Sequence, residues 1–175
     1  MIIPPSHEYK QEVIAQYKEK YKYDILIETG TYEGDMVESQ KRRFKKILSI
    51  ELGDNLYLNA VDKFKNDENV SIIHGDSGKV LSEILNHTNE SAIFWLDGHY
   101  SGGITALGEK QTPIVEELDA IFKHKNMKHV ILIDDARCFL KELGYPTIPE
   151  LKELIENNNY HVDVINDIIR CEPYA

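Results

Sequence analysis

The sequence predicts an α/β fold, a doubly wound and mostly parallel sheet with helices on both faces and an antiparallel C-terminal hairpin strand. Short runs rich in Ile, Leu and Val alternate with longer polar segments of helical spacing, which is typical of βαβ units. Several of these runs are apolar at nearly every position, as expected for parallel strands covered on both faces. Two extended runs at the end of the chain predict the hairpin.

Length and charge restrict the domain organisation and the partners. The chain has 175 residues, enough for one ordinary domain, so we interpret 1–175 as one domain in which 1–23 form an N-terminal helix packed on or covering the core. The 30 acidic and 20 basic residues give a formal net charge of -10, which would repel a phosphate backbone and argues against a nucleic-acid partner.

Cysteine content and hydropathy bear on location. The two cysteines, Cys138 and Cys171, form no disulfide framework or zinc-finger pattern, which favours a reducing cytoplasm. No stretch approaches the roughly 20 apolar residues that a membrane span requires, so no membrane partner is expected.

The first predicted helix follows Pro4-Pro5, where Ser6 can cap its N-terminus. Its apolar residues recur every four positions and therefore share one face. They are Tyr9, Val13, Tyr17 and Tyr21. We expect this stripe to pack on the domain; a substrate lid or a dimer surface is the alternative.

The apolar runs predict five strands, with helices between them. The strands are 24–28 (DILIE), 47–51 (ILSIE), 70–73 (VSII), 92–96 (AIFWL) and 130–133 (VILI). Helices are expected near 35–45, 54–66, 78–87 and 113–124. The first of these ends in KRRFKK, which we interpret as a solvated helix C-terminus rather than a basic patch.

The C-terminal part predicts one more helix and a hairpin. The helix lies near 148–158 and is followed by the extended runs HVDVIND and IIRCEP. Asn166-Asp167 separates the runs and is suited to a tight turn. The sheet is therefore expected to end with an antiparallel strand.

The first strand runs into a glycine turn, Glu28-Thr29-Gly30-Thr31-Tyr32-Glu33-Gly34. In an open parallel sheet, ligands bind beyond the carboxyl ends of the strands. The turn is neither the G-x-G-x-x-G fingerprint nor a phosphate-binding loop with its Lys, and its acids would repel a pyrophosphate. An uncharged or cationic ligand suits it better; a plain strand-to-helix turn is the alternative.

The next two strand ends also carry polar residues. Glu51 follows the glycine turn at the interval at which a βαβ unit places an acid against a ribose diol. Asp76 could accept a hydrogen bond from the amine of adenine, and Ser77 could cap the following helix. Alternatively, Asp76 or Ser77 is only the helix N-cap.

These features together resemble the class I S-adenosylmethionine-dependent methyltransferases. That family has an acid and a glycine-rich turn after strand one, a ribose-binding acid after strand two and an Asp after strand three, matched by 28–34, Glu51 and Asp76. The resemblance covers nearly the whole chain and implies a Rossmann-like seven-stranded sheet with S-adenosylmethionine as cofactor. It implies as cofactor-binding residues Glu28, Thr29, Gly30, Thr31, Tyr32, Gly34, Glu51, Asp76, Ser77 and Asp97.

Three carboxylates follow the fourth and fifth strands. Asp97 comes after the fourth strand and Asp134-Asp135 after the fifth. Crowded carboxylates repel one another unless a cation or proton compensates, and oxygen-only ligation suits Mg²⁺. The alternative is that they only cap or start turns. The set resembles that of metal-dependent macrocin-type sugar and antibiotic O-methyltransferases, which implies Asp97, Asp134 and Asp135 as metal ligands.

The residues after Asp97 are candidates for catalysis and acceptor binding. His99 could be a general base, a metal ligand or only a loop residue, and a carboxylate such as Asp97 could take the proton instead. Tyr100 and Arg137 are candidates for acceptor contacts. The glycine-rich segment 101–112 could fold over the substrate or be a loop without function.

The leading hypothesis is a Mg²⁺-dependent O-methyltransferase that uses S-adenosylmethionine and acts on a hydroxylated small molecule such as a sugar. A non-catalytic adenosyl- or metal-binding module is one alternative, and another metal-dependent enzyme such as a hydrolase is a second. A homodimer is left open.

Overall fold

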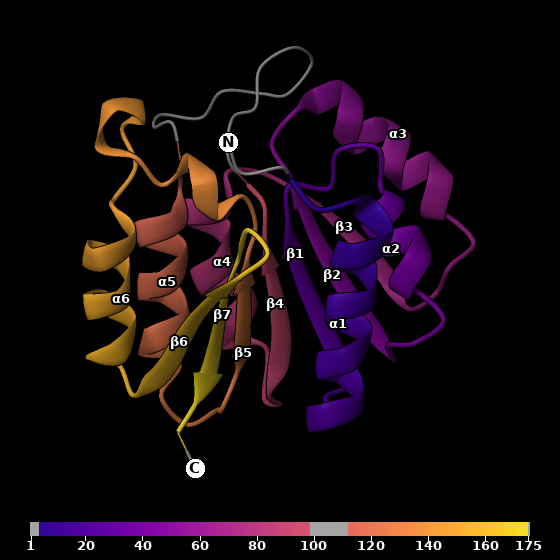
Figure 1. Cartoon of the computed structure of the whole chain (residues 1–175). Coiled ribbons are helices and arrows are strands. Elements are labelled where there is room, and N and C mark those ends of the chain that lie inside the picture. The colour runs from indigo at the N-terminus through magenta and orange to yellow at the C-terminus, as the bar shows by residue number, and fades with distance from the viewer. Residues whose placement is uncertain (1–3, 99–111, 175) are drawn as a thin grey trace.

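The computed structural model describes residues 4–98 and 112–174, and its strands form one mixed sheet (Figure 1). His99, Tyr100 and all of 101–112 except Thr112 lie outside the described residues. Over the described part of the chain the sheet has seven strands in the order β3-β2-β1-β4-β5-β7-β6. The strands are β1 (Ile25–Thr29), β2 (Lys46–Glu51), β3 (Val70–His74), β4 (Ala92–Leu96), β5 (Val130–Ile133), β6 (Tyr160–Ile165) and β7 (Ile168–Pro173).

The pairing confirms the predicted α/β fold class. β1 to β5 are mutually parallel, whereas β7 pairs antiparallel with β5 and β6 antiparallel with β7. Asn166 and Asp167, between β6 and β7, both have positive φ, at 49° and 63°, as a two-residue hairpin turn of type I′ requires. The carboxyl ends of the five parallel strands therefore lie along one edge of the sheet, which is the upper edge in Figure 1.

Helices cover both faces of the sheet, as the apolar strands require. α1, α2 and α3 lie on one side and α4, α5 and α6 on the other (Figure 1). They span α1 (His7–Tyr21), α2 (Asp35–Gln40), α3 (Asp54–Phe64), α4 (Ser77–Asn86), α5 (Ile114–Lys123) and α6 (Ile148–Glu156). Two short 3-10 helices, η1 (Ala136–Cys138) and η2 (Lys141–Leu143), follow β5.

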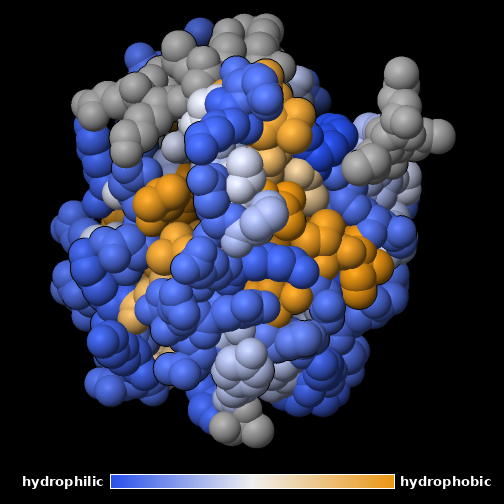
Figure 2. Space-filling view, turned by 60° about the vertical axis from the view of Figure 1, so that its left-hand side comes forward, coloured by the Kyte–Doolittle hydropathy of each residue, from blue (hydrophilic) through white to orange (hydrophobic). Residues whose placement is uncertain are grey.

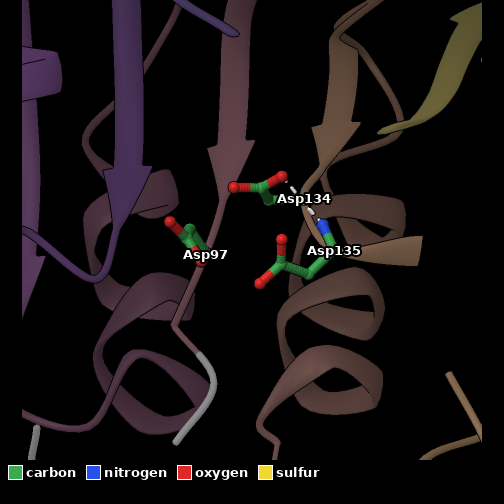
Figure 3. A group of neighbouring side chains, drawn as sticks. All are labelled: Asp97, Asp134 and Asp135. Carbon is green, nitrogen blue, oxygen red and sulfur yellow. Dashed lines mark hydrogen bonds between the residues drawn. The ribbon is translucent and has the colours of Figure 1, made fainter. Parts of the chain in front are cut away.

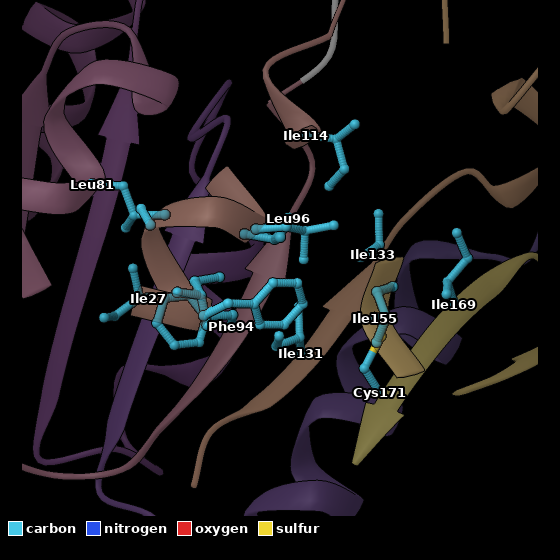
Figure 4. Close-up of a cluster of buried hydrophobic side chains, with 14 of the residues drawn as sticks. Ile27, Leu81, Phe94, Leu96, Ile114, Ile131, Ile133, Ile155, Ile169 and Cys171 are labelled. Carbon is cyan, nitrogen blue, oxygen red and sulfur yellow. The ribbon is translucent and has the colours of Figure 1, made fainter. Parts of the chain in front are cut away.

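The strands supply two cores because successive side chains point to opposite faces. On β4, Phe94 and Leu96 join the core under α4, α5 and α6 that Figure 4 shows, whereas Ile93 and Trp95 join the core under α1, α2 and α3. Trp95 is 1% exposed, so it is a core residue.

The N-terminal helix α1 packs on the sheet. Ser6 is its N-cap and accepts a hydrogen bond from the Tyr9 N–H at 3.2 Å. Val13, Ile14 and Tyr17 are buried in the core that contains Trp95. α1 is thereby fixed on the sheet, with its first turns near the carboxyl edge.

The prediction for α2 was wrong in extent. The helix ends at Gln40, before the basic run 41–46, and Lys46 already belongs to β2. The reason is Phe44, which is 3% exposed and must turn into the core that α2 and α3 cover. Local charge favoured a longer helix, but burial of one aromatic side chain decides the chain path.

Among the described residues, no helix combines the length and the apolar character needed to cross a membrane.

Candidate functional site

Gly30 brings the glycine turn into direct contact with the end of β4. Its φ is 82°, and its N–H donates to the Ile50 carbonyl oxygen at 2.9 Å. A Cβ at this position would lie 2.3 Å from the Asp97 carbonyl oxygen, closer than any side chain could approach. The Asp97 N–H in turn donates to the carbonyl and the hydroxyl of Thr29, at 3.1 and 3.3 Å. The turn and the fourth strand end therefore form one tightly packed unit.

Glu51 holds the same turn from the other side. Its Oε2 accepts from the Tyr32 N–H and its Oε1 from the Gly53 N–H, both at 2.8 Å. Tyr32 has φ 51° and an exposed side chain, and Gly34, with φ 77°, is the N-cap of α2. The ribose contact of Glu51 stays a prediction, and its contact with Gly53 was not predicted from the sequence. Because a carboxylate has about four acceptor sites, Glu51 retains capacity for ribose hydroxyls.

Glu28 lies beneath the turn in a buried network. Its side chain accepts a short hydrogen bond from the Ser49 hydroxyl, which is 2.6 Å from the Thr31 hydroxyl. Burial raises the pKa of Glu28 to about 8, against the lowering effect of the Ser49 hydrogen bond, and the charges of Asp97 and Glu51 add to the rise. Glu28 is thus largely protonated at neutral pH, and it and Thr31 support the turn from inside.

Asp76 and Ser77 stand at the start of α4. Asp76 is the N-cap and accepts from the Gly78 N–H at 3.0 Å, which confirms the alternative predicted for it, whereas the prediction that Ser77 caps this helix was wrong. Ser77 is the first helical residue and donates to Glu117 Oε1 at 2.5 Å. Glu117, which is 1% exposed, was not predicted from the sequence. Its position three residues after Ile114, on the apolar face of α5, was the available signal.

The three aspartates predicted as metal ligands do meet at the edge of the sheet (Figure 3). Asp97 comes from the end of β4, and Asp134 and Asp135 from the end of β5; one oxygen from each lies within 4.8 Å of the others. We call Asp97, Asp134 and Asp135 the acidic cluster. Asp135 has φ 54°, a left-handed conformation that is uncommon for a residue other than glycine, and its N–H donates to Asp134 Oδ1 at 2.8 Å. This backbone conformation directs both neighbouring carboxylates to one place.

Lys10 of α1 reaches the acidic cluster, a contact that the sequence analysis missed. Its ammonium lies 2.5 Å from Asp134 Oδ2 and 3.5 Å from Asp135 Oδ1. Lys10 precedes the buried Val13 and Ile14 by three and four residues, so the helix aims it at the sheet. That spacing was the only sequence signal for its role.

The charges of the acidic cluster are only partly compensated by Lys10. Burial lowers the pKa of the Lys10 ammonium, but the Asp134 hydrogen bond and the carboxylate charges outweigh it, and the net shift is upward. The pKa of Asp134 is also raised, by burial and by the charge of Asp135, although Lys10 opposes the rise. Lys10 therefore offsets only part of the effect that burial and the Asp135 charge have on Asp134.

Arg137 links the acidic cluster to the β6–β7 turn. Its guanidinium donates to Asp135 Oδ1 at 2.7 Å and makes a second, short ion pair with Asp167. Its backbone N–H donates to Asp167 Oδ1 at 2.7 Å. Arg137 is 30% exposed, so an acceptor contact stays a prediction alongside this structural role.

The acidic cluster fits a hard divalent cation. It offers oxygen donors from three side chains, and Asp134 is almost fully buried. Mg²⁺ prefers such oxygen ligands and keeps several waters. Asp97, Asp134 and Asp135 are therefore the residues that could hold it.

No family model and no curated protein matches the sequence. Solved structures do match the fold. The SAH-bound methyltransferase PaMTH1 of Podospora anserina has a TM-score of 0.71 at 13% identity, over 98% of this chain and 80% of that one. The O-methyltransferase TomG of Streptomyces achromogenes, in complex with SAM, has 0.69 at 11%, over 97% and 82%. The 23S rRNA methyltransferase ErmE has 0.61 at 13%, over 99% and 70%. The chain thus has the Rossmann-like fold found in methyltransferases.

Proposed function

We propose that this chain is an S-adenosylmethionine-dependent, Mg²⁺-dependent O-methyltransferase that acts on a hydroxylated small molecule such as a sugar. The observation that carries the proposal is the contact of Gly30 with the Asp97 backbone. In this contact the glycine turn lies beside the acidic cluster at the sheet edge, and this supports the proposal because ligands bind at that edge in open parallel sheets.

The cofactor would lie over the ends of β1, β2 and β3. The Gly30 turn lets a ligand approach the backbone, Glu51 would accept from the ribose hydroxyls, and Asp76 would face the adenine amine. Thr29 and Thr31 have buried hydroxyls, so their part in binding would be through the backbone. The acidic edge favours a cationic sulfonium over a pyrophosphate.

The acceptor would lie over the ends of β4 and β5. Asp97, Asp134 and Asp135 would hold Mg²⁺, which when bound polarises an acceptor oxygen and orients it. His99 or Asp97 would take the hydroxyl proton, and Tyr100 and Arg137 would contact the acceptor. Orientation of the nucleophile toward the methyl group supplies much of the rate, because it removes the entropy of encounter.

The proposed acceptor class rests on charge as well as on the cluster. A net charge of -10 opposes binding of a polyanion, which favours a small hydroxylated molecule. The likeness to an rRNA methyltransferase means that RNA must be included among the acceptors tested.

Location and assembly belong to the same proposal. A cytoplasmic location is supported by the two free cysteines, Cys138 and Cys171. The face shown in Figure 2 is mainly hydrophilic with separate apolar groups, and exposed apolar side chains of the described residues include Leu140 and Ile165, at 50% and 45%. A homodimer would cover some of them, and sedimentation equilibrium measures whether one forms.

The test is transfer of a labelled methyl group from S-adenosylmethionine to a panel of sugars, catechols and RNA, with Mg²⁺ or with EDTA. We expect a methylated sugar or related diol only with Mg²⁺. Asp134→Asn should abolish turnover and leave cofactor binding nearly intact, whereas Asp163→Asn on exposed β6 should leave both turnover and cofactor binding unchanged. Activity that survives EDTA would remove the metal from the proposal, and RNA as the sole product would overturn the acceptor class.

A further inference from the structure

The ammonium of Lys10 occupies the acidic cluster from the side of α1. Its two carboxylate contacts, at 2.5 Å to Asp134 and 3.5 Å to Asp135, join residues 124 and 125 positions apart in the sequence. The side chains of Lys10 and Asp134 are only 12% and 1% exposed. This ion pair is therefore largely withdrawn from water. Charges in the protein interior act on one another much more strongly than charges at the surface.

Because α1 is fixed on the sheet, only the side chain of Lys10 has to move to break this contact. Val13, Ile14 and Tyr17 fix the helix on the sheet, so α1 cannot withdraw without exposing its core residues. Lys10 lies in the first turns of the helix and carries its charge on a flexible four-carbon stem. The ammonium can therefore leave the cluster by rotamer changes while the backbone stays in place.

We propose that Lys10 is an internal cation that competes with divalent metal for the acidic cluster. It occupies the cluster when no metal is bound and withdraws when Mg²⁺ binds. The inference rests on the metal site of the proposed function, and adds that Lys10 sets the affinity of that site.

Competition follows from charge and from the oxygens involved. Lys10 binds Asp134 Oδ2, an oxygen of the carboxylate that Mg²⁺ would need at roughly 2.0–2.1 Å. An ammonium and a dication sharing one buried carboxylate repel each other at short range. Arg137 already contacts Asp135 from the other side, so Lys10 adds to positive charge that is present there. Metal binding therefore has to displace Lys10. When no metal is bound, Lys10 keeps the carboxylates together.

The experiment compares Lys10→Met with Lys18→Met, a matched control on the same helix. Lys18 is 14% exposed and pairs with Asp24 at 2.6 Å, away from the cluster. Each variant and the unsubstituted chain are titrated with MgCl₂ by calorimetry and with Mn²⁺ by electron paramagnetic resonance. We expect Lys10→Met to bind either metal about tenfold or more tightly than the unsubstituted chain, and Lys18→Met to bind as the unsubstituted chain does.

A second readout needs no variant. Brief acylation of lysines in the unsubstituted protein, followed by peptide mass spectrometry, should show Lys10 becoming more reactive on addition of Mg²⁺ while Lys18 does not change. It keeps the test decisive if Lys10→Met fails to fold.

The outcomes separate the inference from the proposed function. The competition is overturned if the unsubstituted chain binds metal and Lys10→Met binds it with equal or lower affinity. It is also overturned if Mg²⁺ leaves the acylation of Lys10 unchanged. Either result leaves the metal site standing. Absence of metal binding in both overturns the inference together with the Mg²⁺ part of the proposed function. The cofactor part is decided separately, by titration with S-adenosylmethionine.

Discussion

Replacing Gly30 with alanine tests the contact that joins the glycine turn to the end of β4. The new Cβ would lie 2.3 Å from the Asp97 carbonyl oxygen, whereas an ordinary contact begins at 3.4 Å. One of the two backbones would therefore have to move by about 1 Å. A left-handed φ costs alanine about 1–2 kcal/mol, and forcing an extra atom into a packed site costs about 1–3 kcal/mol. We expect Gly30→Ala to lower the free energy of unfolding by about 2–5 kcal/mol.

Gly144→Ala is the matched control for this prediction. Gly144 has φ 76°, close to the 82° of Gly30, but lies exposed at the end of η2. It should show the conformational cost alone, about 1–2 kcal/mol. The assay is urea unfolding followed by far-UV circular dichroism at 25 °C. A loss in Gly30→Ala no larger than that in Gly144→Ala would refute the close approach of the turn to Asp97.

The remaining predictions concern stability. Burial raises the pKa of Glu28 to about 8 from an ordinary 4.5, so between these pH values the folded chain keeps a proton that the unfolded chain releases. The free energy of unfolding should therefore fall as pH rises from about 4.5 to about 8. Glu28→Gln should flatten this fall between about pH 6.5 and 8 in urea titrations. Burial and the nearby His124 lower the pKa of His129 to about 4 from 6.5, so stability should fall as pH drops from 6.5 toward 4, and His129→Gln should reduce that slope. Thr147→Ala removes the capping box of α6 and should cost about 1 kcal/mol by the same assay; no loss would contradict the capping role.

The sheet could be predicted because its signals are local. Runs such as 92–96 are apolar at every position, which is typical of a short parallel strand covered on both faces. The residue types of Asn166 and Asp167 likewise predict a tight hairpin turn, because both residues tolerate positive φ. Strand order places the ends of β4 and β5 side by side, which is why three aspartates far apart in sequence could be predicted to meet.

What the sequence analysis missed depends on contacts between distant segments. Lys10 looks like any surface lysine of an amphipathic helix until α1 is placed over the sheet with its first turns beside Asp134. The charge of the basic run after Gln40 favours a helix C-terminus there, but the helix ends earlier because Phe44 has to reach the core. Helix propensity and charge act within a few residues, whereas tertiary burial overrides both.

The most direct measurement is a calorimetric titration of the folded chain with S-adenosylmethionine, repeated with Gly30→Ala. We expect saturable binding of one cofactor per chain, weakened in the variant because the turn is displaced from the Asp97 backbone. A folded chain that shows no saturable binding would contradict a cofactor site at this edge of the sheet.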